Sequence, residues 1–320
     1  MVSLYHITRC MSNISVALCT CNGAHYIEHQ LESIRQQQLP VDEIVVCDDL
    51  SSDETISVIR HFKEASGIDV RIVINNPRLG VCGNFDKAIR LCSGDIIFLC
   101  DQDDLWLPEK TKCVMEWFKE NPDKDVVFTN GYFMDNQEQS FTQRTLFAAV
   151  GFTTKAQMLF DKGFQLEAFL QHNRATGATM ALRKSFLSYI QIDVTATNAN
   201  GKPLHDHVIA LAAASLQRLG YISRALIRYR IHDTQECGFG NWIKKPPTND
   251  DLAYPIHAKK EYVNCVLPQA KERACFGTER RRYRRLTHKS EIIANRARYK
   301  ELYGTIGCLP LLKDLFWLGF

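Results

Sequence analysis

The sequence lacks the features that would place it outside the ordinary globular class. No segment of its 320 residues reaches the roughly 18–20 uncharged apolar residues that a membrane span needs. Residues 1–11 are mixed and mostly polar, without the basic-then-apolar order of a secretory signal. With 45% apolar and 23% charged residues, the composition excludes a disordered, collagen-like or fibrous chain. We therefore expect a cytoplasmic protein of one large domain or two modest ones.

The cysteines lack the spacing of a disulfide framework or of a zinc site. The chain has twelve, and Cys19, Cys47 and Cys100 end apolar runs that are typical of core strands. We expect them to be small buried side chains kept reduced in the cytoplasm. Cys19 and Cys21 are too close together for a zinc pair, and no second pair accompanies them.

Excess positive charge is absent from most of the chain and is concentrated near its end. Residues 271–300 contain eleven Lys or Arg and three Glu, whereas the whole chain carries a net charge of only +3. No nucleic-acid-binding signature accompanies this run, so no nucleic-acid partner is expected. A basic segment followed by the apolar, aromatic-rich residues 309–320 is typical of attachment to an anionic membrane surface. A solvated helix packed on the domain explains the pattern equally well.

What the sequence does contain, from residue 14 onward, is an alternation of short β-branched runs with helix-like stretches. The first half predicts strands over 14–19, 43–47, 70–74 and 95–100, with helices over 24–37, 54–65 and 82–92 and another opening at Pro108. Strands this apolar are covered on both faces, which predicts an α/β fold with a mostly parallel, doubly wound sheet. Such sheets bind ligands beyond the carboxyl ends of their strands.

The second half is patterned more loosely. It predicts strands over 125–129, 179–182 and 225–229, a helix over 206–219, and a less regular stretch over 131–175. A helical basic region is expected over 239–320, and residues 1–13 are expected to be an N-terminal extension.

An acidic loop follows the second predicted strand. Its sequence from Asp48 to Thr55 is DDLSSDET, in which Ser52 or Asp53 is typical of a helix cap. A cap does not explain the adjacent carboxylates of Asp48 and Asp49 at the tip of a buried strand. They indicate ligand donors or a bound cation.

A second acidic loop follows the fourth predicted strand. Asp101, Asp103 and Asp104 are three carboxylates within four residues, which is electrostatically unfavourable unless positive charge lies among them. In an extended turn Asp101 and Asp103 face one side and Gln102 turns away. Hard oxygen ligands of this kind suit Mg²⁺ or Mn²⁺ held jointly with a substrate's phosphates. The alternative is an acidic surface turn before a helix.

These segments resemble the inverting glycosyltransferases of family 2, which have a GT-A fold, and most closely their bacterial rhamnosyltransferase-like members. The matching motifs, in the order that the group shows, are SVALCTCN (15–22), the 48–55 loop, FLCDQDDLWLPEK (98–110), TGATMAL (176–182), residues 205–208 and YRIHDTQECG (229–238). The resemblance implies a GT-A domain over 14–238, with a nucleotide-sugar-binding half over 14–121 and an acceptor-side half over 122–238. One departure is Cys21, where the family often has an aromatic residue.

The resemblance also implies roles for individual residues. Thr20, Asn22 and Asp49 would line the nucleoside pocket of the nucleotide-sugar donor, and Asn84 would lie near it. Asp101 would contact the ribose, and Asp103 would bind the Mg²⁺ or Mn²⁺ ion. Arg230 would contact the phosphates, and His232 would contact the diphosphate or the metal. On the acceptor side, Thr176 and Gly177 let the backbone approach the acceptor closely.

The sequence His205-Asp206-His207 opens a predicted helix, which by itself is typical of a cap with two exposed histidines. The resemblance places Asp206 where the family's catalytic base stands. Inverting transfer needs a carboxylate that takes the proton from the acceptor hydroxyl. His205 and His207 are competing candidates for this base, and we rank Asp206 first.

The expected function is a metal-dependent hexosyl- or rhamnosyltransferase. It would transfer a sugar from a UDP- or dTDP-sugar to a hydroxyl of a growing, lipid-linked cell-surface polysaccharide such as lipopolysaccharide, at the inner face of the membrane. A sugar nucleotidyltransferase is an alternative, although residues 20–23 lack the glycine-rich basic phosphate loop of that class. A non-catalytic nucleotide- or cation-binding module is the other alternative.

Overall fold

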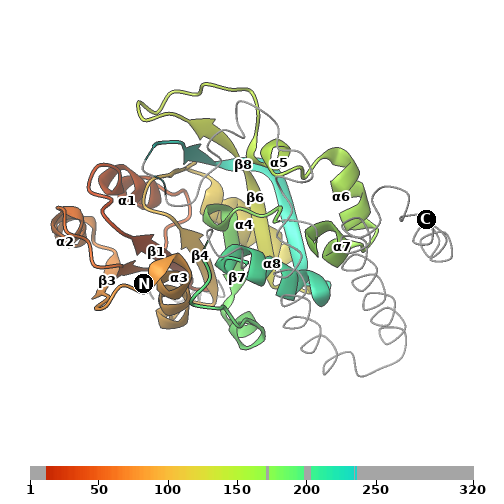
Figure 1. Cartoon of the computed structure of the whole chain (residues 1–320), viewed down its shortest axis with the longest axis horizontal. Coiled ribbons are helices and arrows are strands. Elements are labelled where there is room, and N and C mark those ends of the chain that lie inside the picture. Colours follow the sequence, from red (N-terminus) through yellow and green to blue (C-terminus); the bar gives the residue numbers. More distant parts are fainter. Residues whose placement is uncertain (1–11, 171–172, 198–202, 234, 236–320) are drawn as a thin grey trace, which may run out of the picture.

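The computed structural model describes residues 12–170, 173–197, 203–233 and 235 (Figure 1). Eight strands of this part of the chain form one sheet in the order β3-β2-β1-β4-β7-β6-β8-β5. The strands are β1 (Ile14–Thr20), β2 (Glu43–Asp48), β3 (Asp69–Ile74), β4 (Ile96–Cys100), β5 (Leu105–Trp106), β6 (Val126–Met134), β7 (Met180–Arg183) and β8 (Leu219–Arg230). The α-helices are α1 (Ile27–Arg35), α2 (Thr55–Ser66), α3 (Gly80–Leu91), α4 (Lys110–Glu120), α5 (Leu146–Ala149), α6 (Thr154–Asp161), α7 (Gln165–Leu170) and α8 (His205–Ser215).

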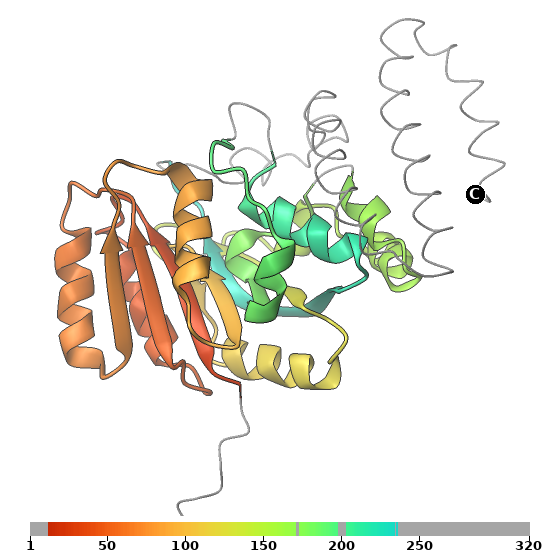
Figure 2. The ribbon, with the colours of Figure 1, turned by 90° about the horizontal axis from the view of Figure 1, so that it is seen from below.

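The N-terminal half has the predicted strand–helix alternation. Every residue of β1, β2 and β4 is buried, because these central strands are covered on both faces. The helices are amphipathic: α1, for example, buries Ile27, Leu31 and Ile34, which recur on one face. Figure 2 shows α3 lying against the strands of this half, and it contacts β1, β2 and β4 as well as α8.

The register of the parallel strands brings three loops together. Thr20 at the end of β1 pairs with Asp48 at the end of β2, and Leu18 pairs with Cys100 at the end of β4. The loops that follow these strands therefore meet at one edge of the sheet. The polar and acidic residues predicted to form a site lie in these loops, as expected for a doubly wound sheet.

The C-terminal half makes the sheet mixed. Among the described strands, β7 runs antiparallel to β4 and β6, β5 runs antiparallel to β8, and the other four pairings are parallel. Strand β8 begins at Leu219, six residues before the predicted start, and α8 ends at Ser215 rather than at residue 219.

The stretch over 131–175 is more regular than predicted. It contains the end of β6 and the helices α5, α6 and α7. These short helices surround an aromatic cluster in which Phe128 of β6 contacts Phe147, Phe152, Phe160 and Phe169 at ring-centroid distances of 5.1–6.5 Å. Aromatic pairs at such distances stabilise a core beyond the area that they bury.

The predictions for residues 1–11 and for the basic region over 239–320 lie outside the described residues. Within the described residues, each helix is too short or too polar to span a bilayer.

Candidate functional site

A cavity of about 550 Å³ lies where the loops after β1, β2 and β4 meet the start of α8. Eight of the nine predicted site residues line it: Thr20, Asn22, Asp49, Asn84, Asp101, Asp103, Asp206 and His232. Residues separated by more than 200 positions in the sequence thus face one space. The ninth residue, Arg230, lies behind the cavity wall.

The acidic pair after β2 is held by hydrogen bonds from the chain itself. Asp48 is fully buried and accepts hydrogen bonds from the hydroxyl of Thr20 at 2.8 Å and from the backbone N–H of Ser51 at 2.8 Å. Asp49 accepts from the backbone N–H groups of Leu79 (2.7 Å) and Gly80 (2.9 Å) at the start of α3. These donors stabilise both charges without a cation, and Asp49 also lines the cavity, so the role of the pair as ligand donors or as a cation site stays a prediction.

Polar residues around the same end of the cavity hold its wall in shape. Asn84 donates to the carbonyl of Cys47 at 2.8 Å and accepts from the side chain of Asn75 at 2.8 Å. Asn22 has a φ of 49°, a backbone conformation that asparagine tolerates, and its side chain accepts from the N–H of Ser52 at 2.8 Å. This end of the cavity is thus rigid and rich in polar groups.

The loop after β4 places two carboxylates on the cavity. Asp101 and Asp103 line it, as predicted. Gln102 lines it too, contrary to the prediction that it turns away, and its side chain hydrogen-bonds the backbone N–H (2.8 Å) and carbonyl (3.0 Å) of Cys21. Burial and the negative charges of Asp103 and Asp206 raise the pKa of Asp101 to about 8. The crowded carboxyl groups of this loop therefore hold protons more tightly than isolated aspartates do.

Asp103 and His232 form the best candidate for a cation site. The Nε2 atom of His232 lies 2.8 Å from Oδ2 of Asp103 at the cavity wall. Within the described residues no group of three or more His, Cys, Asp or Glu side chains is arranged to hold a metal. A carboxylate and an imidazole fit a divalent ion whose other ligands are a diphosphate and water, because Mg²⁺ and similar ions usually bind through few protein groups in phosphate sites.

Asp206 lines the same cavity from the first turn of α8. Its carboxylate accepts hydrogen bonds from the N–H of Gly177 (3.2 Å) and of its neighbour His207 (2.7 Å). Burial raises the pKa of Asp206 to about 6, although these hydrogen bonds oppose the rise. A carboxylate with this pKa accepts protons more readily than an ordinary aspartate and is still ionised at pH 7.

The two histidines that flank Asp206 are poorly suited to act as the base, and both are buried, contrary to the exposed alternative. Burial lowers the pKa of His205 to about 3, so its neutral ring is a weak proton acceptor. His207 is 2% exposed and its Nε2 atom contacts the carbonyl of Phe169 at 2.9 Å.

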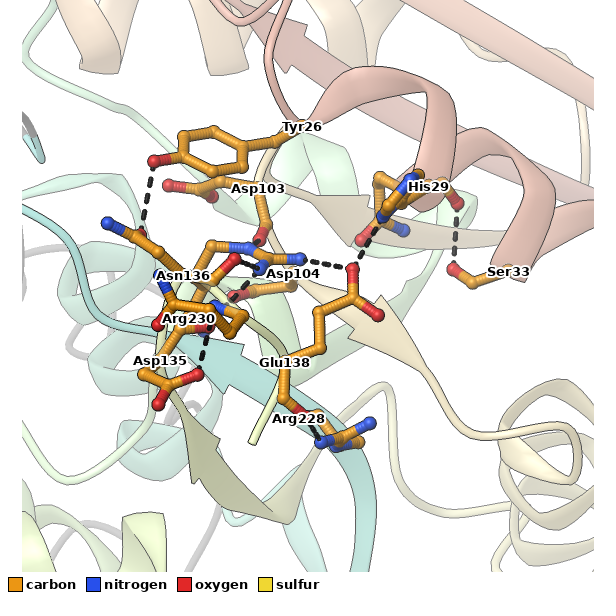
Figure 3. A network of polar contacts seen from close by, with 12 residues as sticks. Tyr26, His29, Ser33, Asp103, Asp104, Asp135, Asn136, Glu138, Arg228 and Arg230 are labelled. Atoms are coloured by element: carbon orange, nitrogen blue, oxygen red, sulfur yellow. Dashed lines mark hydrogen bonds and ion pairs between the residues drawn. The ribbon is translucent and has the colours of Figure 1, made fainter. Parts of the chain in front are cut away.

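Arg230 is the predicted site residue that the structure places elsewhere. Its side chain is 1% exposed, and Figure 3 shows it packed under Tyr26 among backbone and carboxylate oxygens. The guanidinium donates to four groups: the carbonyls of Asp103 (2.7 Å), Asp135 (3.2 Å) and Asn136 (3.3 Å) and the carboxylate of Glu138 (3.0 Å). The predicted phosphate contact is not supported, because these N–H groups are already engaged. Arg230 instead ties the 101–104 loop to the loop after β6.

Some cavity residues were not predicted. Tyr26 of the loop before α1 packs against His232 at a ring-centroid distance of 4.7 Å, and Phe85 of α3 stacks on His205. Both stand in helical patterns that indicate core packing, so the sequence holds no separate signal for them. Gln235 lines the cavity beyond β8 and donates to the carbonyl of Arg230 at 2.8 Å.

The comparisons with known proteins identify the family of the chain. The model of the family described as Glycosyl transferase family 2 matches residues 15–190, more than half of the chain. The chain therefore belongs to glycosyl transferase family 2, and the predicted family is confirmed.

Curated relatives match shorter segments. A UDP-Glc:alpha-D-GlcNAc-diphosphoundecaprenol beta-1,3-glucosyltransferase, WfgD of Escherichia coli, is 27% identical over 108 residues, which are 34% of this chain and 42% of the relative. A dTDP-rhamnosyl transferase, RfbG of Shigella flexneri, is 34% identical over 99 residues, which are 30% of this chain and 34% of the relative. The chain thus matches about a third to two fifths of the length of these relatives.

Solved structures show the same fold. The structure of residues 1–349 of S. aureus TarS in complex with UDP-GlcNAc superposes with a TM-score of 0.55 at 15% identity, covering 80% of this chain and 66% of TarS. This likeness confirms the GT-A architecture.

The structural role of Arg230 predicts a loss of stability when its charge is removed. Arg230→Met removes one donor from the carboxylate of Glu138 and from each of three carbonyl groups, so the free energy of unfolding should fall by about 2–4 kcal/mol. Arg224→Met, which removes an ion pair of a 60% exposed side chain with Glu109, should cost less than about 1 kcal/mol. Urea unfolding followed by circular dichroism measures both. Equal stability of the two variants would contradict the assignment.

Proposed function

We propose that this protein is a metal-dependent inverting glycosyltransferase that transfers a sugar from a nucleotide-diphosphate sugar to an acceptor hydroxyl. The observation that carries the proposal is that the Asp103–His232 pair and Asp206 line one cavity. The pair offers ligands for a cation, and Asp206 offers a carboxylate with a raised pKa. Membership of glycosyl transferase family 2 supports the same reaction class.

The donor nucleotide is assigned to the wall formed by the loops after β1 and β2. Thr20, Asn22, Asp49 and Asn84 line this part of the cavity, and Asp49 presents a fixed carboxylate edge to a nucleobase N–H. Asp101 is assigned to the ribose. Asp103 and His232 would hold Mg²⁺ or Mn²⁺, which supplies positive charge for the departing diphosphate when it is bound.

Asp206 is assigned as the base. It takes the proton of the acceptor hydroxyl while that oxygen forms a bond to the anomeric carbon, and the bond from this carbon to the diphosphate oxygen breaks with its electron pair leaving on the diphosphate. The hydrogen bonds from Gly177 and His207 hold the carboxylate in one orientation through this exchange. Attack from the side opposite to the leaving group inverts the anomeric configuration.

The finer assignments of donor, acceptor and location rest on the names of the relatives and on the sequence. The names of WfgD and RfbG refer to a UDP-sugar with a diphosphoundecaprenol-linked acceptor and to a dTDP-sugar, which supports a UDP- or dTDP-sugar donor and a lipid-linked glycan acceptor here. TarS was solved with UDP-GlcNAc, which supports a nucleotide-sugar donor. We further propose that the basic region over 239–320 contacts an anionic membrane surface at the cytoplasmic face, where such acceptors are built.

A panel of nucleotide sugars tests the reaction class. Incubation of the full chain with UDP-, dTDP- and GDP-sugars and Mn²⁺ should release nucleotide diphosphate from one donor group, because water replaces the missing acceptor slowly. Release should stop on addition of EDTA and in Asp103→Asn. Formation of nucleoside triphosphate and sugar phosphate when pyrophosphate is added would favour a nucleotidyltransferase. Binding without release from any donor, even with lipid-linked acceptors present, would favour a non-catalytic module.

The raised pKa of Asp206 predicts a pH dependence. Because the base must be ionised, kcat should fall as the pH is lowered through about 6 and reach a plateau above it. Asp206→Asn should lower kcat by at least about a hundredfold, with the affinity for the nucleotide sugar unchanged. Initial rates between pH 5 and 8 and calorimetric donor titrations measure these effects. A near-normal rate for Asp206→Asn would show that the base lies elsewhere.

A further inference from the structure

His205 has an environment that its position in the fold does not explain. It is the first residue of α8, is 5% exposed, and borders the cavity beside Asp206. Its ring stacks on Phe85 with the centroids 4.0 Å apart and the planes inclined by 15°. The stacking fixes the plane of the imidazole, so the directions of its two nitrogen atoms are also fixed.

Neither ring nitrogen of His205 has a hydrogen-bond partner within the described residues. His207, two residues further along the same helix and equally buried, uses its Nε2 atom on the carbonyl of Phe169. An unpaired buried polar atom destabilises a protein by about 1–3 kcal/mol. A phenylalanine at position 205 would stack on Phe85 without this penalty, so the unpaired nitrogens point to a missing partner.

The protonation state of His205 narrows the chemistry of that partner. Burial lowers the pKa of its ring to about 3, so the imidazole is neutral and carries one N–H donor and one acceptor nitrogen. A hydroxyl group matches such a ring because it both donates and accepts a hydrogen bond. A phosphate needs donors only and would be served better by a cation.

The ring of His205 lies next to the base. A Cβ atom added to Gly177 would stand 2.9 Å from Nε2 of His205 and 3.4 Å from Cβ of Asp206, so the backbone of Gly177 packs closely against both side chains. The N–H of Gly177 also donates to the Asp206 carboxylate. Both His205 and Asp206 line the cavity, so a ligand group that bonds to the imidazole would lie beside the base.

We propose that His205 is a specificity-determining residue that hydrogen-bonds a sugar hydroxyl group beside the reacting centre. The inference rests on the proposed function and assigns a subsite within it. The hydroxyl belongs either to the transferred sugar or to the acceptor sugar. A hydroxyl of either sugar would bond to the imidazole in the same way. A site built to bond a hydroxyl rejects an analogue that lacks it, because the buried polar atoms then stay unpaired.

His205→Phe tests the proposal, since it keeps the ring and the stacking on Phe85 but removes both nitrogens. The variant should be at least as stable as the wild type in thermal unfolding and should bind UDP or dTDP unchanged. If the hydroxyl is on the donor sugar, the Kd of the variant for the nucleotide sugar should rise about ten- to a hundredfold. If the hydroxyl is on the acceptor sugar, the KM for the acceptor should rise by the same factor. His205→Gln, which restores an amide donor and acceptor, should recover part of the loss.

His207→Phe is the matched control and should lower stability, because it breaks the bond to Phe169.

Deoxy analogues of the two sugars identify the hydroxyl. For the analogue that lacks it, wild type and His205→Phe should have the same Kd or KM, whereas they differ for the natural sugar. If wild type binds a nucleotide sugar and His205→Phe matches it in Kd, KM and kcat within twofold, this inference is overturned and the proposed function stands. If wild type binds and cleaves no nucleotide sugar, the proposed function itself fails.

Discussion

The site depends on keeping several carboxylates close together at the ends of adjacent parallel strands. Parallel register alone brings the loops after β2 and β4 to one edge of the sheet, where their charges repel. This repulsion is relieved in different ways on the two sides of β1. On the β2 side, backbone N–H groups at the start of α3 bind Asp49. On the β4 side burial and neighbouring negative charge raise the pKa of Asp101 to about 8. On the side assigned to the cation, part of the repulsion is thus relieved by protonation.

Buried basic residues support that side from beneath. Lys110 of α4 is fully buried, donates to the carbonyl of Ala178 at 2.8 Å, and lies 4.0 Å from the ring centroid of Trp106. Burial lowers its pKa to about 7, against the charges of Cys100, Asp104 and Asp101. Arg230 holds the 101–104 loop by donating to the carbonyl of Asp103. Because Ala178 follows the glycine that binds Asp206, Lys110 supports the turn that orients the base, and its amino group acts electrostatically on Asp101 and Asp104.

The fold of the N-terminal half and most of the site could be predicted from the sequence, because the signals there are local. Apolar runs of strand length each end in polar or acidic residues, and parallel register then aligns those ends without further information. The segment over 131–175 could not be predicted, because α5 has only four residues and its aromatic side chains meet Phe128 only in three dimensions. Arg230 was misassigned because β8 ends at this residue. The chain then changes direction, so that Arg230 points into the protein and His232 onto the cavity. The unpaired nitrogens of His205 carry no sequence signal, since a histidine's partners depend on the whole packing around it.

The central claim is that Asp103 and His232 hold a divalent ion together with a nucleotide diphosphate. The most direct measurement is a Mn²⁺ titration followed by electron paramagnetic resonance, with and without saturating UDP or dTDP. The account predicts that the nucleotide tightens Mn²⁺ binding about tenfold or more, and that Asp103→Asn abolishes this coupling while the variant still folds. Mn²⁺ binding that is the same with and without either nucleotide, or coupling that survives in Asp103→Asn, would contradict it.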